Sequence, residues 1–211
     1  MTPIQEAYEK TAKTVIENLK KRQMEGYYCA DKTAAVQKVL ELMPKGASVS
    51  WGGSMTLGEA GIMDALQASE YRLIDRTKAK TPGEQRAVYG EICTSDFFLT
   101  STNAITLDGE LVNIDGNGSR LAFLIFGPQN VIVVAGMNKL VKDAESGYKR
   151  VKTVACPPNA ARLGRKTPCA LNGVCGDCYA SDCICSQTVI TRRSHVPNRI
   201  KVILVGESLG Y

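Results

Sequence analysis

The run from Asn130 to Ala135 limits the fold of this 211-residue chain more than any other feature, because it reads Asn-Val-Ile-Val-Val-Ala. Four consecutive β-branched residues favour a strand over a helix. A strand that is apolar at successive positions must be covered on both of its faces, which is typical of central strands in parallel sheets. The run therefore predicts an α/β fold.

Signals for helices and strands alternate along the rest of the chain. Helices are expected at 3–24, 32–43, 56–66, 82–93, 120–126 and 141–154. Strands are expected at 47–51, 71–75, 97–100, 188–190 and 200–205, with a hairpin that turns at Asp108-Gly109. Alternation of this kind predicts a Rossmann-like, three-layer domain over residues 1–211, with a mostly parallel sheet and helices on both faces.

The composition is that of an ordinary globular protein. The chain carries 26 Lys and Arg against 21 Asp and Glu, a net charge of +5, and shows no basic stripe interleaved with aromatic residues. We therefore expect no nucleic-acid partner. Seven basic and two acidic residues lie between positions 142 and 166. This local excess fits either the binding of an anionic small molecule or a solvated helix face.

The N-terminal sequence is polar and lacks the apolar core of a signal peptide. No stretch approaches the roughly 20 apolar residues that a membrane span requires. The sequence therefore predicts a cytoplasmic protein with no membrane partner, in which thiols are kept reduced. It leaves the oligomeric state open, a homo-oligomer included.

A first glycine-rich turn follows the expected strand 47–51. Glycines allow backbone amides to approach an anion at the start of a helix. The candidate ligand contacts in this turn are Gly52, Gly53, Ser54 and Thr56. Glu59 is the candidate catalytic carboxylate. The alternative is structural: Thr56 and Glu59 have the spacing of a capping box.

A second glycine-rich turn, 115–120, also opens an expected helix. Its candidate ligand contacts are Asn117, Gly118, Ser119 and Arg120, and the guanidinium group is suited to bidentate binding of phosphate or carboxylate. Alternatively, Ser119 is an ordinary N-cap in a connector. Lys139 follows the apolar strand and is a further candidate contact or a surface lysine. Because the carboxyl ends of parallel strands meet at one edge, these groups are expected to share a crevice.

The segment 156–186 is rich in cysteine and lacks a clear period, so a cysteine-rich loop is expected there. The candidate metal ligands are Cys169, Cys175, Cys178 and Cys185. Their spacing leaves three alternatives open: an iron–sulfur cluster, zinc, or no cofactor, with free or redox-active thiols. His195 is the only histidine, which excludes a histidine-rich zinc site and a Ser-His-Asp triad.

Taken together, these motifs resemble the LUD-domain family, named for bacterial lactate utilisation. The resemblance lies in Trp51–Glu59, in Asn103–Gly109 running to Gly136–Lys139, and in Ala155–Arg162. It covers about residues 5–165 and continues into the last residues, and it is closest to the short stand-alone form with a cysteine-rich tail. The family is similar to ribose-phosphate isomerases and CoA transferases.

The resemblance implies a Rossmann-like sheet and an anionic ligand bearing phosphate, carboxylate or CoA. It also implies work in or beside an oxidoreductase system, with iron–sulfur partner subunits. Asn103, a further candidate ligand contact, stands where the isomerases carry Asp, and an amide cannot act as a general base. Two alternatives remain: an isomerase or transferase that uses Glu59, and a non-enzymatic ligand sensor.

Overall fold

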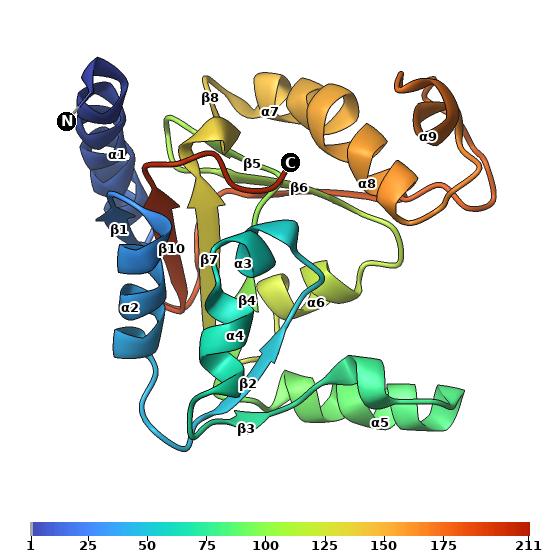
Figure 1. Ribbon diagram of the computed structural model, residues 1–211, viewed down its shortest axis with the longest axis horizontal. Coiled ribbons are helices and arrows are strands. Elements are labelled where there is room, and N and C mark those ends of the chain that lie inside the picture. Colours follow the sequence, from blue (N-terminus) through green and yellow to red (C-terminus); the bar gives the residue numbers. More distant parts are fainter. Residues whose placement is uncertain (1) are drawn as a thin grey trace.

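The computed structural model describes residues 2–211, whose strands form two sheets (Figure 1). The larger sheet is parallel throughout. Its six strands, in spatial order, are β1 (Glu25–Cys29), β10 (Ile200–Val205), β7 (Asn130–Gly136), β4 (Phe97–Thr100), β2 (Ser48–Trp51) and β3 (Arg72–Leu73). The four strands of the smaller sheet, in spatial order, are β8 (Leu140–Val141), β5 (Ala104–Thr106), β6 (Leu111–Asp115) and β9 (Gln187–Thr191).

The expected central strand is β7, which pairs with β10 on one side and β4 on the other. Its side chains alternate between two separate cores, as the pleat of a strand requires. Val131 and Val133 belong to one core, and Ile132 and Val134 belong to the other. This double burial confirms the prediction of an α/β fold around a strand covered on both faces.

Helices cover both faces of the larger sheet. One face packs against α2 (Lys32–Leu42), α3 (Met55–Glu59) and α4 (Ile62–Gln67). The other face packs against α1 (Pro3–Lys21), α5 (Pro82–Cys93), α6 (Ser119–Ile125) and the smaller sheet. The outer face of the smaller sheet packs against α7 (Ala144–Arg150) and the start of α8 (Cys156–Arg162), and α9 (Pro168–Asn172) follows (Figure 1).

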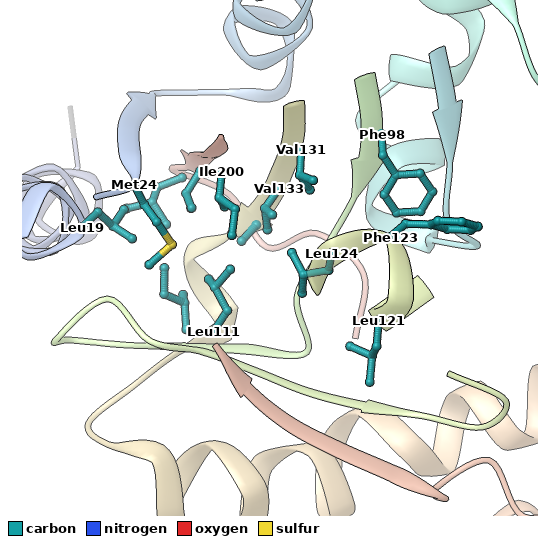
Figure 2. Close-up of a cluster of buried hydrophobic side chains, with 14 of the residues drawn as sticks. Leu19, Met24, Phe98, Leu111, Leu121, Phe123, Leu124, Val131, Val133 and Ile200 are labelled. Carbon is teal, nitrogen blue, oxygen red and sulfur yellow. The ribbon is translucent and has the colours of Figure 1, made fainter. Parts of the chain in front are cut away.

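Figure 2 shows the core between the larger sheet, α1, α6 and the smaller sheet. Leu19 of α1 and Leu111 of β6 both lie fully buried in it. The rings of Phe98 and Phe123 contact each other with centroids 5.1 Å apart, which joins α6 to β4. This core therefore fixes the smaller sheet against the larger one. None of the helices within residues 2–211 has the length and apolar character needed to cross a membrane.

The expected starts of the helices at 32 and 82 are confirmed, and each helix begins with a side-chain cap. Thr81 and Glu84 form a capping box at the start of α5, and Asp31 caps α2. The expected helix 56–66 is wrong in one respect, because it is interrupted at Gly61, whose φ is +78°. The chain turns there, so α3 and α4 form two short helices.

Two corrections concern the C-terminal half. The expected helix 141–154 begins only at Ala144, after the N-cap Asp143, and continues through a π-helical turn, Val151–Ala155, into α8. The segment 156–186 is therefore not a loop throughout, since α8 and α9 lie inside it. The hairpin at Asp108-Gly109 is confirmed, but it belongs to the second sheet, which the alternation of helices and strands did not indicate.

Candidate functional site

A cleft of about 730 Å³ opens at the carboxyl ends of three neighbouring strands, β2, β4 and β7. It is bounded by the turn after β2, the turn after β6, the segment after β4 and the cysteine-rich segment. Ser54 and Ser119, from the two glycine-rich turns, both line it. The turns therefore meet at one crevice, as expected for the carboxyl edge of a parallel sheet.

The first glycine-rich turn is held by Ser54, which is the N-cap of α3: its Oγ accepts a hydrogen bond from the Leu57 amide at 3.3 Å. The alternative capping box of Thr56 and Glu59 is therefore wrong. Thr56 is buried and lines the cleft, together with Gly53. Gly52 lies beneath the cleft, where an added Cβ would be 3.3 Å from Arg120 Cγ and from Thr100 Oγ1. Glycine at this position makes room for Arg120.

The second glycine-rich turn begins α6 with Gly118 as the N-cap, at a φ of +81°. The alternative in which Ser119 is the N-cap is therefore wrong. The Ser119 amide donates to Asn117 Oδ1 at 3.0 Å, which holds the turn in shape. Asn117 and Ser119 line the cleft, and Gly118 supplies the backbone conformation that orients them.

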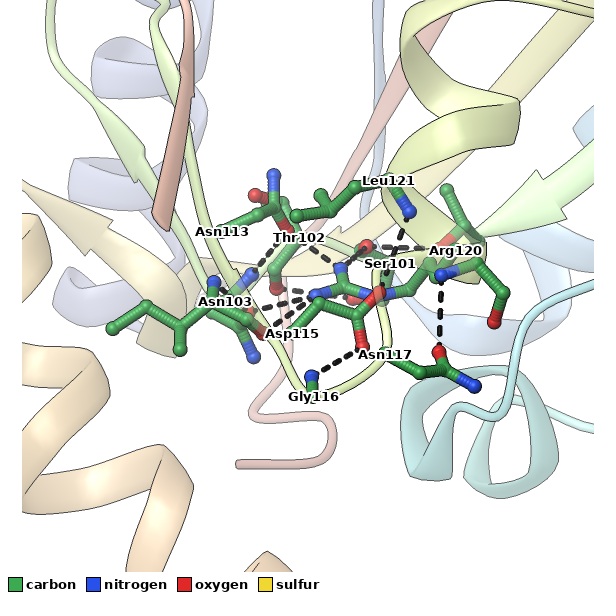
Figure 3. Close-up of polar contacts among 12 residues, drawn as sticks. Ser101, Thr102, Asn103, Asn113, Asp115, Gly116, Asn117, Arg120 and Leu121 are labelled. Carbon is green, nitrogen blue, oxygen red and sulfur yellow. Dashed lines mark hydrogen bonds and ion pairs between the residues drawn. The ribbon is translucent and has the colours of Figure 1, made fainter. Parts of the chain in front are cut away.

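Arg120 lies at the centre of a polar network (Figure 3), and only 14% of its side chain is exposed. Its four Nη–H groups donate to the carbonyl oxygens of Ser101 (3.2 Å) and Ile114 (2.9 Å) and to Oδ1 of Asn113 (2.6 Å) and Asn103 (3.1 Å). Its Nε lies 3.8 Å from Asp115 Oδ2. The Nη–H groups that the sequence suggested for bidentate ligand binding are therefore already used within the protein. A ligand in the cleft would meet Arg120 as a fixed positive charge.

Asn103 lines the cleft and joins the same network. Its Oδ1 accepts from the Ile114 amide at 3.0 Å as well as from Arg120, and its carbonyl accepts from Arg150 Nη1 at 2.6 Å. These bonds anchor the segment after β4 to β6 and α7. The oxygen of the Asn103 amide is therefore used in positioning the cleft wall.

Lys139 lies at the cleft wall with only 4% of the residue exposed. Its Nζ donates to Thr56 Oγ1 at 2.8 Å and to Ser101 Oγ at 3.0 Å. These two hydroxyls come from the segments that follow β2 and β4, so the amine connects three strand ends. The alternative of an ordinary surface lysine is wrong.

The charge state of Lys139 is perturbed by its surroundings. Burial is the main reason that its pKa falls to about 7. The guanidinium groups of Arg150 and Arg120 lower the pKa further, and the Glu59 carboxylate acts in the opposite direction. A buried amine that titrates near neutrality is unusual among lysines and often marks a functional group.

Glu59, the candidate catalytic carboxylate, is exposed and is not one of the residues that line the cleft. Its Oε2 accepts a hydrogen bond from the Gly210 amide at 2.6 Å. Thr56 Oγ1 donates to the carbonyl of Leu209 at 3.3 Å, and so the same helix holds the C-terminal segment at two points. In this structure Glu59 therefore holds the C-terminal segment against α3.

The cleft is strongly cationic, and part of this charge was missed by the sequence reasoning about sites. Its lining includes the four arginines Arg76, Arg120, Arg162 and Arg165, the amine of Lys139, and the acids Asp115 and Asp182. Arg162 and Arg165 belong to the basic stretch 142–166, whose charge excess was the available signal. Nothing in the sequence around Arg76 indicated a role in the site. Arg76 follows β3 and lies at the cleft because β3 pairs with β2.

The cysteine-rich segment forms another wall of the cleft. Cys185 Sγ lies 3.3 Å from Cys156 Sγ, and this hydrogen bond is the main cause that lowers the pKa of the Cys156 thiol. Within residues 2–211, no three His, Cys, Asp or Glu side chains converge in a way that could hold a metal ion. In this structure the thiols are not gathered around one point, and we derive no chemistry through a metal. The set Cys169, Cys175, Cys178 and Cys185 stays a prediction.

Fold and cleft together define an α/β protein with a basic pocket at the carboxyl edge of a parallel sheet. The family model of the LUD domain matches residues 12–205, and the chain therefore belongs to the LUD domain family. A DUF162 family protein from Deinococcus radiodurans has a similar structure, with a TM-score of 0.56 and 12% identity, over 94% of this chain and 98% of that chain. This likeness shows the fold alone.

Ribose 5-phosphate isomerases resemble only about half of the chain. The enzyme from Neisseria gonorrhoeae gives a TM-score of 0.35 at 15% identity, over 53% of each chain. The enzyme from Plasmodium falciparum gives 0.34 at 16% identity, over 53% of this chain and 52% of that chain. No curated protein matches the sequence.

Proposed function

We propose that this LUD-domain protein binds an anionic small molecule, one that bears phosphate, carboxylate or CoA, in the cleft between the two glycine-rich turns. The observation that carries the proposal is the charge of the lining, in which four arginines face two acids even when Lys139 is left out of the count. Charges of one sign in a concave site focus the electrostatic field and attract a ligand of the opposite sign. A cleft at the strand ends of an α/β sheet is also the usual ligand position in such folds.

The cations divide into a fixed set and a set available to the ligand. The four Nη–H groups of Arg120 are used internally, whereas Arg165 is exposed at the cleft. The guanidinium of Arg76 lies over the first glycine-rich turn, since an added Cβ at Gly53 would be 3.3 Å from Arg76 Nη2. We infer that Arg76 and Arg165 contact the anionic group directly.

Removing either contact is expected to weaken anion binding by at least about tenfold, because a hydrogen bond to a charged group contributes about 1.5–3 kcal/mol and 1.4 kcal/mol is a factor of about ten. The measurement is calorimetric titration of the protein and of R76Q and R165Q with phosphate, lactate, pyruvate and CoA. The matched control is R86Q, which removes an exposed arginine of α5 outside the cleft lining. Absence of saturable binding for every one of these anions would contradict the proposal.

We further propose that the protein works in or beside an oxidoreductase system. Membership of the LUD family, a domain associated with lactate utilisation, supports this role. No observation favours the isomerase or transferase alternative, because Glu59 holds Gly210 and does not line the cleft. Saturable anion binding with no turnover in any partner-free assay would favour the third alternative, a ligand sensor.

The predicted metal or cluster has its own test. Protein purified without oxygen is expected to contain iron and acid-labile sulfide, or zinc, in amounts that fall when Cys175 and Cys178 are both changed to Ser. The pair is chosen because vicinal thiolates in a Cys-x-x-Cys sequence can grip one metal. The control is Cys93→Ser, on α5, away from the segment. Metal-free wild-type protein would end the prediction.

A further inference from the structure

Lys139 is a buried lysine that lacks an acidic partner. In the part of the chain that the structure describes, no carboxylate lies within 4.0 Å of its Nζ, although only 4% of the residue is exposed. Buried charges are normally paired, since burial of an unpaired charge is costly. The absence of an ion pair in this position favours the neutral amine.

The hydrogen-bond directions show what the amine can do. Thr56 Oγ1 gives its single proton to the Leu209 carbonyl, and Ser101 Oγ gives its proton to the Thr102 carbonyl. Each hydroxyl can therefore only accept from Lys139, at 2.8 Å and 3.0 Å. A neutral amine has two N–H groups, and both are used in these bonds. Its lone pair is left for the cleft that Lys139 lines.

The charges around the amine point the same way. Arg150 and Arg120 oppose protonation, and Glu59 favours it more weakly, so that burial and repulsion bring the pKa of Lys139 to about 7. At neutral pH a large fraction of the amine is therefore unprotonated. A lysine kept only to attract anions would be expected to stay charged, as the arginines of the same lining do.

We infer that Lys139 is the nucleophile of this cleft and forms an imine with an aldehyde or ketone that carries a carboxylate or phosphate group. The inference rests on the proposed function, because the anionic group is held by the cleft cations. The lone pair of Nζ adds to the carbonyl carbon, and a proton moves from nitrogen to the former carbonyl oxygen. Loss of one water then leaves the carbon–nitrogen double bond, with no change of oxidation state.

Reductive trapping with glyoxylate, a small anionic aldehyde, and cyanoborohydride tests this chemistry in the intact protein at pH 7. Lys139 is expected to be modified at least about a hundredfold faster than exposed lysines such as Lys10 and Lys142, as measured by peptide mass spectrometry. The reason is that a pKa near 7 in place of the ordinary lysine value of about 10.4 raises the neutral fraction by roughly a thousandfold. Inorganic phosphate should slow the modification of Lys139 alone.

The outcomes separate the inference from the proposed function. If phosphate binds in calorimetry but Lys139 reacts no faster than Lys142, the inference is wrong and the anion-binding function stands. If Lys139 reacts fast without protection by phosphate, its partner is not an anionic carbonyl compound and the inference again fails. If no anion binds, the proposed function itself is lost. The rate should also rise around pH 7, a dependence that a purely structural lysine would not produce.

Discussion

Replacing Arg120 with methionine is expected to lower the free energy of unfolding by about 3–5 kcal/mol, the usual cost of removing one member of a buried charged network. Methionine fills similar space, but it removes the guanidinium donors from four oxygen acceptors, of which the two Asn Oδ1 atoms keep one backbone N–H each. These acceptors lie on the segment after β4 and on β6. The loss should therefore also loosen the cleft wall, and urea denaturation followed by circular dichroism measures it.

Two further variants make the result specific. R120K keeps the positive charge but has no planar fork, and we expect it to recover less than half of the lost stability. R86M removes an exposed arginine from α5 and should change stability by no more than about 0.5 kcal/mol. A wild-type-like R120M would show that the network contributes little and that Arg120 is available to a ligand after all.

Sequence reasoning succeeded where local signals determine the outcome. The strand β7 and the helix α5 are both determined by neighbouring residues, and both were placed correctly. The expected helix 3–24 was less accurate, because α1 ends at Lys21 and β1 follows at Glu25. No strand was expected there, and β1 pairs with β10 from the far end of the chain. A five-residue edge strand of this kind is decided by its partner and has a weak pattern of its own.

The second sheet could not be predicted because its pairing is entirely non-local in sequence apart from one hairpin. β8 contains only two residues, Leu140 and Val141, and becomes a strand because β5 lies beside it. β9 reaches β6 from more than 70 positions away, as the pairing of Val112 with Ile190 shows. A strand was expected at 188–190, but its own sequence does not indicate β6 as its partner, and β8 is too short to show any periodicity.

Sequence reasoning predicted which residues lie at the site better than it predicted what those residues do. Both glycine-rich turns and Lys139 do lie at one cleft, because strand ends of a parallel sheet must meet. The role of Arg120 could not be read from sequence, since its acceptors lie in two separate segments, the one after β4 and β6. The contact between Cys156 and Cys185 was missed for a related reason: these sulfurs are 29 positions apart and meet only through the folding of α8.

The stability of the protein is expected to rise with pH, relative to the variant K139M, between about pH 7 and pH 10. In the folded state the pKa of Lys139 is about 7, and in the unfolded chain it returns to the ordinary lysine value of about 10.4. Between these values the unfolded chain binds a proton that the folded protein does not. Stability rises with pH wherever the unfolded state holds more protons. Below pH 7 the folded protein therefore carries the full free-energy cost of burying a protonated Lys139. This cost disappears as the pH rises toward about 10.

The difference in unfolding free energy, wild type minus K139M, should grow by about 1.4 kcal/mol per pH unit in this window and be flat below pH 6. Urea titrations at half-unit intervals measure it, and the comparison with K139M removes the contribution of every other titrating group. The control K142M, which replaces an exposed lysine, should show no such slope against wild type. A flat difference for K139M would mean that Lys139 stays protonated in the folded protein. Its lone pair would then be absent at neutral pH, and both the imine chemistry and the neutral amine would have to be abandoned while the cationic cleft remained.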